Sequence, residues 1–129
     1  MKPRAPRSFK DLWVWQRGMA LALDIFKLTE QAAPNDRSGV VVGLRRSAIA
    51  IPVSVARGYG IGSRGAFVRA LLRAYGRTEE VETQLHIATE LGIVARGAVD
   101  KARLSNDEIS QTLLNMLTSF PHAPEFDVG

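Results

Sequence analysis

The side chains in this sequence that are best suited to acid–base chemistry are Glu80, Glu82 and His86. Two carboxylates act as general acid and base only when both reach one substrate. The two glutamates are separated by two positions, which places them about 200° apart on a helix. His86 follows Glu82 by four residues, but a metal site or a general base needs more partners than this pair supplies. We therefore expect no catalytic residue and no metal site, and we expect the glutamates to form ion pairs with Arg45 or Arg46.

A glycine-rich segment, residues 58–62 with the sequence GYGIG, has the composition of a phosphate-binding loop. Such loops follow a strand and lead into Gly-Lys-Ser or Gly-Lys-Thr, and neither feature is present here. The segment is therefore predicted to be a turn between two helices. No cofactor is expected from it.

The arginines are distributed unevenly, and no acidic residue occurs between Asp36 and Glu79. The net charge is +4 and the isoelectric point is near 10.0. A segregated basic surface attracts the phosphates of RNA or DNA. The other interpretation is that the arginines pair with acids of the bundle or of a neighbouring subunit. The candidate nucleic-acid-binding residues are Arg57, Arg64, Arg69, Arg73 and Arg77.

Composition bounds the class of protein. The chain has 129 residues, enough for one domain with a core, and it contains no cysteine. We expect a cytoplasmic protein without disulfides, signal peptide or membrane span. Residues 1–8 are predicted to be a mobile basic arm, 9–120 the folded domain and 121–129 a flexible tail.

Apolar spacing predicts four helices, and hence an all-α, up-and-down four-helix bundle. The first helix is expected over about 9–33 with two apolar stripes. The first contains Leu12, Trp15, Met19, Ala22 and Phe26, and the second contains Val14, Leu21, Ile25 and Leu28. We expect another copy of the chain to cover the second stripe. The second is expected to begin near residue 39, to be kinked by Pro52 and to end at 58–60. The third is expected over about 64–91, with Ser63 as its N-cap and a close helix approach at Gly76. Residues 93–104 are a connector, and 105–108 form a capping box for a short fourth helix.

Several motifs, which stand in a fixed order, resemble the four helix bundle protein family, also called the 23S rRNA intervening-sequence protein family. They are a D-L-x-V-W start (residues 11–15), an A-x-x-I-P unit (48–52), A-x-G-Y-G (56–60) and E-x-E-T-Q-L (80–85). The resemblance covers roughly residues 8–94. It implies a four-helix bundle that assembles as a homopentameric ring. Accessory proteins of diversity-generating retroelements form a related group of basic pentameric barrels, which implies contact with nucleic acid and a reverse transcriptase.

The chain departs from this family pattern beside the expected kink. Ser54 stands where relatives usually carry Asn, and Arg57 stands where they usually carry Glu. Arg57 is therefore either a redirected salt bridge or an added nucleic-acid contact. Two functions follow: a non-enzymatic, oligomeric accessory protein that binds RNA or DNA, and an oligomeric scaffold that touches no nucleic acid.

Overall fold

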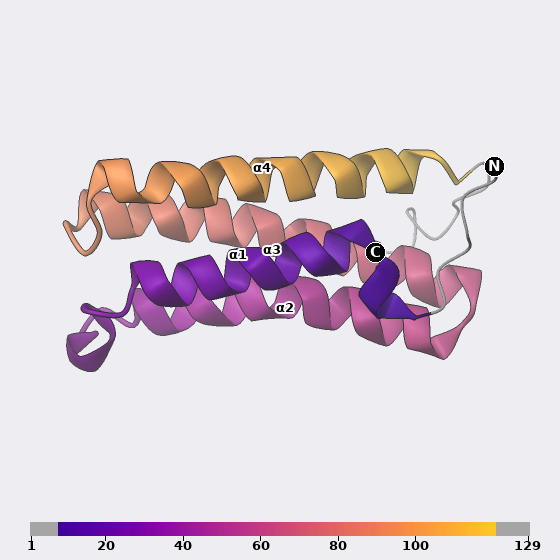
Figure 1. The fold of residues 1–129 in the computed structure, drawn as a ribbon, viewed down its shortest axis with the longest axis horizontal. Helices are drawn as coiled ribbons and strands as arrows, with labels where there is room; N and C mark the ends of the chain where they lie inside the picture. The colour runs from indigo at the N-terminus through magenta and orange to yellow at the C-terminus, as the bar shows by residue number, and fades with distance from the viewer. Residues whose placement is uncertain (1–7, 121–129) are drawn as a thin grey trace.

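The computed structural model describes residues 8–120, and these form four helices with no strand among them. Each helix runs antiparallel to the one before it, in the up-and-down order expected (Figure 1). The predictions of an N-terminal arm and a C-terminal tail fall on residues 1–7 and 121–129, which lie outside the described residues. No described helix is long and apolar enough to cross a bilayer. The helices are α1 (Trp13–Leu28), α2 (Val40–Ile61), α3 (Arg64–Glu90) and α4 (Arg96–Thr118), with short 3-10 turns at Phe9–Asp11 and Ala33–Asn35.

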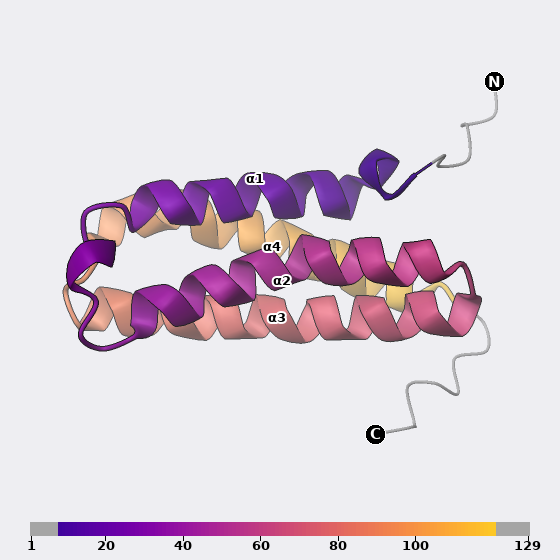
Figure 2. The same ribbon diagram turned by 90° about the horizontal axis from the view of Figure 1, so that it is seen from below.

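One hydrophobic core runs along the bundle between the four helices. On α1 the buried stripe contains Val14, Leu21 and Ile25, so the chain's own core covers the stripe that was expected to need a second copy, and that prediction is wrong. The core is built from residues of every helix, and α2 packs most extensively against α3 (Figure 2). Its largest fully buried side chains are Leu21, Ile25, Leu44, Ile51, Leu71, Leu85, Ile109 and Leu113.

The junction between α1 and α2 differs from the sequence prediction. Helix α1 ends at Leu28 rather than near residue 33, and the buried Thr29 hydroxyl donates to the Ile25 carbonyl at 2.7 Å. Asp36 then accepts from the backbone N–H groups of Val41 at 3.3 Å and Val42 at 3.0 Å. The carboxylate thus satisfies amides at the positive end of α2.

These hydrogen bonds change the acidity of Asp36. Partial desolvation acts to raise its pKa. The bonds from the backbone of Val42, Val41 and Gly39 and from the Ser38 side chain outweigh that effect and hold the pKa below the ordinary 3.8. The Ser38 hydroxyl also accepts from the N–H of Val40 at 3.1 Å.

Helix α2 ends later in the chain than residues 58–60, where its end was predicted from the sequence. The helix continues through Gly58 and Gly60 and ends at Ile61, because Gly62 is the residue that adopts a left-handed φ of 86°. Pro52 lies inside α2 and is buried, and the kink expected there stays a prediction. Ser63 caps α3 as expected, accepting from the N–H of Ala66 at 3.1 Å.

Helix α4 begins at Arg96, so the connector predicted over 93–104 and the capping box at 105–108 are wrong. Ser105 and its neighbours lie in the helix interior. Asn106, the second residue of that box, is buried, and its side-chain amide donates to the Thr78 carbonyl of α3 at 2.9 Å. Helix α1, not α4, is therefore the shortest of the four helices.

Two glycines on α2 allow close approach to α3. A Cβ at Gly58 would overlap the Cβ of Ala70 and would lie 3.1 Å from the Ala66 carbonyl oxygen. A Cβ at Gly43 would lie 3.0 Å from the side-chain nitrogen of Gln84. These two contacts fix the register of the antiparallel helices. Gly76, where a close approach was expected, is exposed and has nothing within 4 Å of its Cβ position among the described residues.

Candidate nucleic-acid interface

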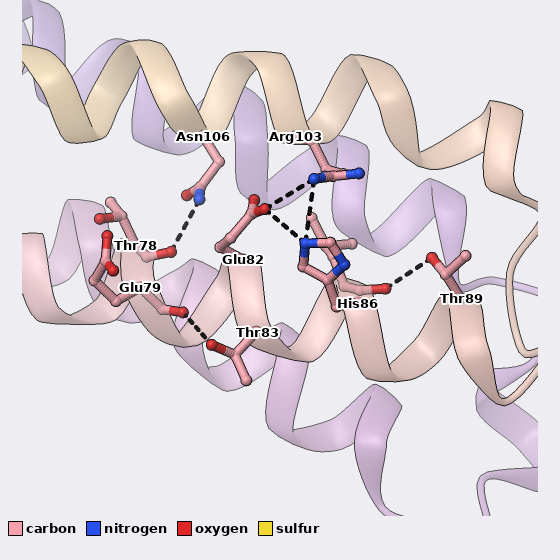
Figure 3. A network of polar contacts seen from close by, with 9 residues as sticks. Thr78, Glu79, Glu82, Thr83, His86, Thr89, Arg103 and Asn106 are labelled. Atoms are coloured by element: carbon pink, nitrogen blue, oxygen red, sulfur yellow. Dashed lines mark hydrogen bonds and ion pairs between the residues drawn. The ribbon is translucent and has the colours of Figure 1, made fainter.

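Glu82 and His86 belong to a polar cluster that joins α3 to α4 (Figure 3). The Arg103 guanidinium of α4 donates to Glu82 Oε1 at 3.0 Å, and His86 Nε2 lies 3.0 Å from the same oxygen. Arg103 Nη2 is also 3.2 Å from His86 Nε2. The carboxylate thus has contacts with side chains on both helices. This arrangement ties two helices together and leaves Glu82 committed to Arg103 rather than available as a base.

Glu80 lies apart from this cluster. Its carboxylate pairs with Arg77, one turn earlier on α3, at 3.3 Å, and both side chains are almost half exposed. The structure therefore keeps Glu80 and Glu82 on different sides of the helix, as their spacing required. No group of three or more potential metal-ligating side chains occurs within residues 8–120.

Arg45 and Arg46 do not pair with Glu80 or Glu82 in the described part of the chain, which corrects the sequence prediction. Arg45 instead donates to Thr29 Oγ1 at 2.8 Å and to the Phe26 carbonyl at 3.2 Å, and its guanidinium stacks 4.3 Å from the Phe26 ring centre. It satisfies a free carbonyl at the negative end of α1. The physical reason is proximity: α2 starts beside the end of α1, whereas Glu82 turns toward α4.

The remaining arginines of α2 and α3 form a surface, which we call the basic face. Gly58 packs at the level of Ala66 and Ala70, so Arg57 stands at the level of Arg69. The side chains of all the arginines in the basic face are exposed. Four-residue spacing advances an α-helix by about 6 Å and turns it by only about 40°, so the three arginines of α3 make one ridge. The basic face consists of Arg46, Arg57, Arg69, Arg73 and Arg77.

Few acidic side chains pair with the arginines of the basic face. Six ion pairs occur among the described residues, and none of them involves a residue of α2. Glu80, bound to Arg77, is the acid that pairs with the basic face. Arg46, Arg57, Arg69 and Arg73 form no ion pair with any part of the chain that the structure describes. Sequence reasoning left Arg46 out of the binding set, although its position eleven residues before Arg57 puts both on one side of α2.

Arg64 is not on the basic face. It precedes Arg69 by five residues, which places it about 140° away around α3. Its guanidinium lies 5.0 Å from the ring centre of Phe120, beyond the end of α4. This cation–π contact joins the start of α3 to the end of the described chain. Of the five predicted binding residues, the structure thus brings four together and sets Arg64 apart.

A second surface feature lies beside the basic face. A groove of about 410 Å³ runs between α1 and α2, and its lining is almost wholly apolar except for Arg57 at its edge. We call it the α1/α2 groove. It exposes the first apolar stripe of α1, with Trp15, Met19 and Phe26, and not the stripe that was expected to need a second copy. Its lining residues are Trp15, Met19, Ala22, Leu23, Phe26, Ile49, Pro52, Val53, Ala56 and Arg57.

These features define a small all-α bundle with an unneutralised basic face and an exposed apolar groove. The model of the 23S rRNA-intervening sequence protein family matches residues 10–115, and the chain belongs to that family. A solved structure from Bacteroides thetaiotaomicron, described as a protein of unknown function from the S23 ribosomal protein family, is similar with a TM-score of 0.76 and 18% identity. The match covers 82% of this chain and 99% of that chain, and it shows the fold. No curated protein matches the chain.

Proposed function

We propose that this protein is a non-enzymatic, homo-oligomeric accessory protein of the cytoplasm that binds RNA through the basic face. The observation that carries the proposal is the row of exposed arginines on α2 and α3 without carboxylate partners. A guanidinium presents several fixed donors that match phosphate oxygens, so such a row suits a polyphosphate backbone better than a single anion. The family name adds the connection to ribosomal RNA, and the homopentameric ring that the resemblance implies is part of the proposal.

The charge distribution also argues against a purely structural role for these arginines. Arg69, Arg73 and Arg77 are like charges at four-residue spacing, which costs an isolated helix a few tenths of a kcal/mol per pair. Glu80 relieves only the last of them. A phosphate ligand would remove the remaining repulsion, because it brings a negative charge beside each guanidinium.

The test is the salt dependence of binding. We expect a labelled RNA hairpin to bind, followed by fluorescence anisotropy, with a log–log slope against salt of up to about −4 if each arginine that the structure leaves without an ion pair meets one phosphate. Replacing Arg69 and Arg73 with alanine should reduce the magnitude of that slope by about 2.

The matched control removes two arginines that lie off the basic face. Arg17 pairs with Glu108 at 3.7 Å, and Arg96 pairs with Glu90 at 3.2 Å. The double variant Arg17→Ala, Arg96→Ala has the same net charge as the test variant, and we expect its slope to equal that of the unmodified protein. An equal loss in both variants would mean that net charge alone attracts RNA. Absence of binding at low salt would end the proposal.

The same substitutions test the scaffold alternative. If the arginines serve subunit contacts, replacing Arg69, Arg73 and Arg77 together should dissociate the oligomer, as measured by light scattering after gel filtration. We expect the oligomer to stay intact. Duplex DNA of the same length serves as the second probe, and equal affinity for it would widen the ligand from RNA to nucleic acid in general.

A further inference from the structure

The α1/α2 groove is a contiguous apolar surface that is open to water in the single chain. Its most exposed residues are Leu23 at 57%, Val53 at 44% and Ile49 at 42%, with Met19 at 39% and Phe26 at 38%. With roughly 150–200 Å² for a whole side chain of this size, they leave on the order of 400 Å² of apolar surface open. That is the size of the largest patch on a typical monomer, and such patches mark interaction sites.

The outer side of α4 carries two exposed leucines, which we call the α4 ridge, and their separation along the helix matches the length of this groove. Leu104 is 63% exposed and Leu114 is 38% exposed, although neither belongs to the core. They are ten residues apart, or about 15 Å along the helix. The groove extends over about the same length, since Trp15 and Phe26 at its two ends are eleven residues apart on α1.

The charges beside the groove are opposite in sign to those on the outer side of α4. Arg46 and Arg57 are exposed and stand on the outer side of α2, and Arg57 lines the groove itself. The exposed Asp100 and Asp107 follow the same side of α4 as Leu104. Pairing two grooves face to face would bring arginines against arginines, which is unfavourable. Placing α4 in the groove brings aspartates against them instead.

We propose that the α4 ridge of one copy of this chain, centred on Leu104 and Leu114, docks in the α1/α2 groove of the next copy. This rests on the homo-oligomer that the proposed function includes, and it names the two faces that build it. Because the faces are different surfaces of the same subunit, the contact is head to tail, and it closes into a ring when the rotation between copies allows. The groove's apolar area is about half of what one side of a stable interface buries, and the polar rim supplies the rest.

The assignment also separates the two roles considered for Arg57. In the assembled protein Arg46 and Arg57 are held beside the aspartates of the neighbouring α4, whereas Arg69, Arg73 and Arg77 on α3 remain open to RNA. Of the four arginines counted for the salt slope, Arg69 and Arg73 then meet phosphate, and the slope falls from its limit of about −4 to about −2. The oligomer contact and the RNA contact then use different residues. Substitutions can therefore remove the oligomer contact or the RNA contact separately.

Cross-linking tests the head-to-tail contact, because the chain contains no cysteine of its own. Val53→Cys and Leu104→Cys variants, one with a larger affinity tag, are co-expressed and treated with a short bismaleimide. We expect a cross-linked dimer of one tagged and one untagged chain, and only when both variants are present. Cross-linking of Val53→Cys to itself would show a groove-to-groove dimer and overturn the assignment, as would the absence of any cross-link in a protein that remains oligomeric.

A second set of variants probes the energetics with exposed residues that should not disturb folding. Leu23→Lys and Leu104→Glu are each expected to raise the apparent Kd of the oligomer at least about tenfold, measured by sedimentation at several concentrations. Their combination should restore part of the loss, since the two new charges attract. Leu91→Glu is the control, because Leu91 is 58% exposed and lines neither surface.

The outcomes separate this proposal from the one on which it rests. An oligomer that is unaffected by Leu23→Lys and Leu104→Glu would overturn the choice of faces and leave the homo-oligomer standing. A chain that is monomeric at every concentration would overturn both, and the groove would then fit a helix of a different protein. RNA binding by a dissociated Leu104→Glu variant, with an unchanged contribution from Arg69 and Arg73, would show that the two surfaces act separately.

Discussion

Gly58 is the position at which the packing of the bundle can be tested most directly. Replacing glycine by alanine inside an exposed helix normally stabilises a protein by about 1 kcal/mol, because alanine has the higher helix propensity. At Gly58 the new methyl group would overlap the Cβ of Ala70 and press on the Ala66 carbonyl. Neither atom is the end of a flexible side chain, so α2 and α3 would have to move apart. Overpacking of this kind costs about 1–3 kcal/mol.

We therefore expect Gly58→Ala to lower the free energy of unfolding by about 1–2 kcal/mol, measured by urea denaturation followed by circular dichroism. Gly60→Ala is the matched control on the same helix. Nothing lies within 4 Å of its Cβ position among the described residues, and it should raise stability by about 0.5–1 kcal/mol. Several protein concentrations are needed, because unfolding of an oligomer depends on concentration.

A double-mutant cycle identifies the cause. Ala70→Gly removes the methyl group that the new side chain meets, so Gly58→Ala should be tolerated better in that background, with a coupling of about 1 kcal/mol or more. If Gly58→Ala proved as stable as Gly60→Ala, the close approach of α2 and α3 would be wrong. The level of Arg57 beside Arg69, and with it the composition of the basic face, would then have to be revised.

Three further changes test the local structure. Asn106→Ala should cost about 1–3 kcal/mol in urea denaturation, because it removes a buried hydrogen bond to the Thr78 carbonyl, whereas Ser105→Ala should be nearly neutral since no capping box exists there. Gly76→Ala should raise the melting temperature, because the site is open and helical. Asp36→Asn tests the lowered pKa: the stabilisation by the carboxylate is present above pH 3.8 and is lost as the pH falls toward the lowered value. The melting temperatures of the variant and the unmodified protein should therefore converge in acid.

Helix number, order and core stripes could be predicted from the sequence, because periodicity depends on residues close together in the chain. Residues 40–44, with the sequence VVVGL, are helical despite their local strand propensity. The errors arose at helix ends. Ser105 to Glu108 has the pattern of a capping box, yet the helix begins nine residues earlier, because tertiary packing of Val99 and Ala102 extends it.

The partners of individual charges could not be predicted in the same way. Arg45 binds Thr29 and a carbonyl of α1, and Glu82 binds Arg103, and both pairings join residues far apart in the sequence. Such pairings depend on which sides of two helices face each other. The apolar stripe of a helix gives its buried side only approximately, so it does not identify the partner of each charge. Arg103 gave no signal at all, since it lay in a segment read as a connector.

The acid-free stretch between Asp36 and Glu79 acquires its meaning from the packing of α2 on α3. Those residues make up all of α2 and the first half of α3, and the two helices are adjacent and antiparallel. The uneven distribution of acidic residues along the chain therefore becomes an uneven distribution of charge over the surface of the bundle. Several acids of α1, α4 and the second half of α3 have basic partners, as in the pairs of Asp24 with Lys101 and of Glu108 with Arg17.

Such exposed ion pairs contribute little to stability, so stability does not explain why one side of the bundle has them and the other lacks them. The basic face carries a small cost from its adjacent like charges, and within the bundle only Glu80 offsets it. A ligand rich in phosphate removes that cost wherever it binds. The residues that make the bundle less stable alone are thus the ones that would favour the proposed complex with RNA, and this asymmetry is the physical reason for proposing the interface on α2 and α3.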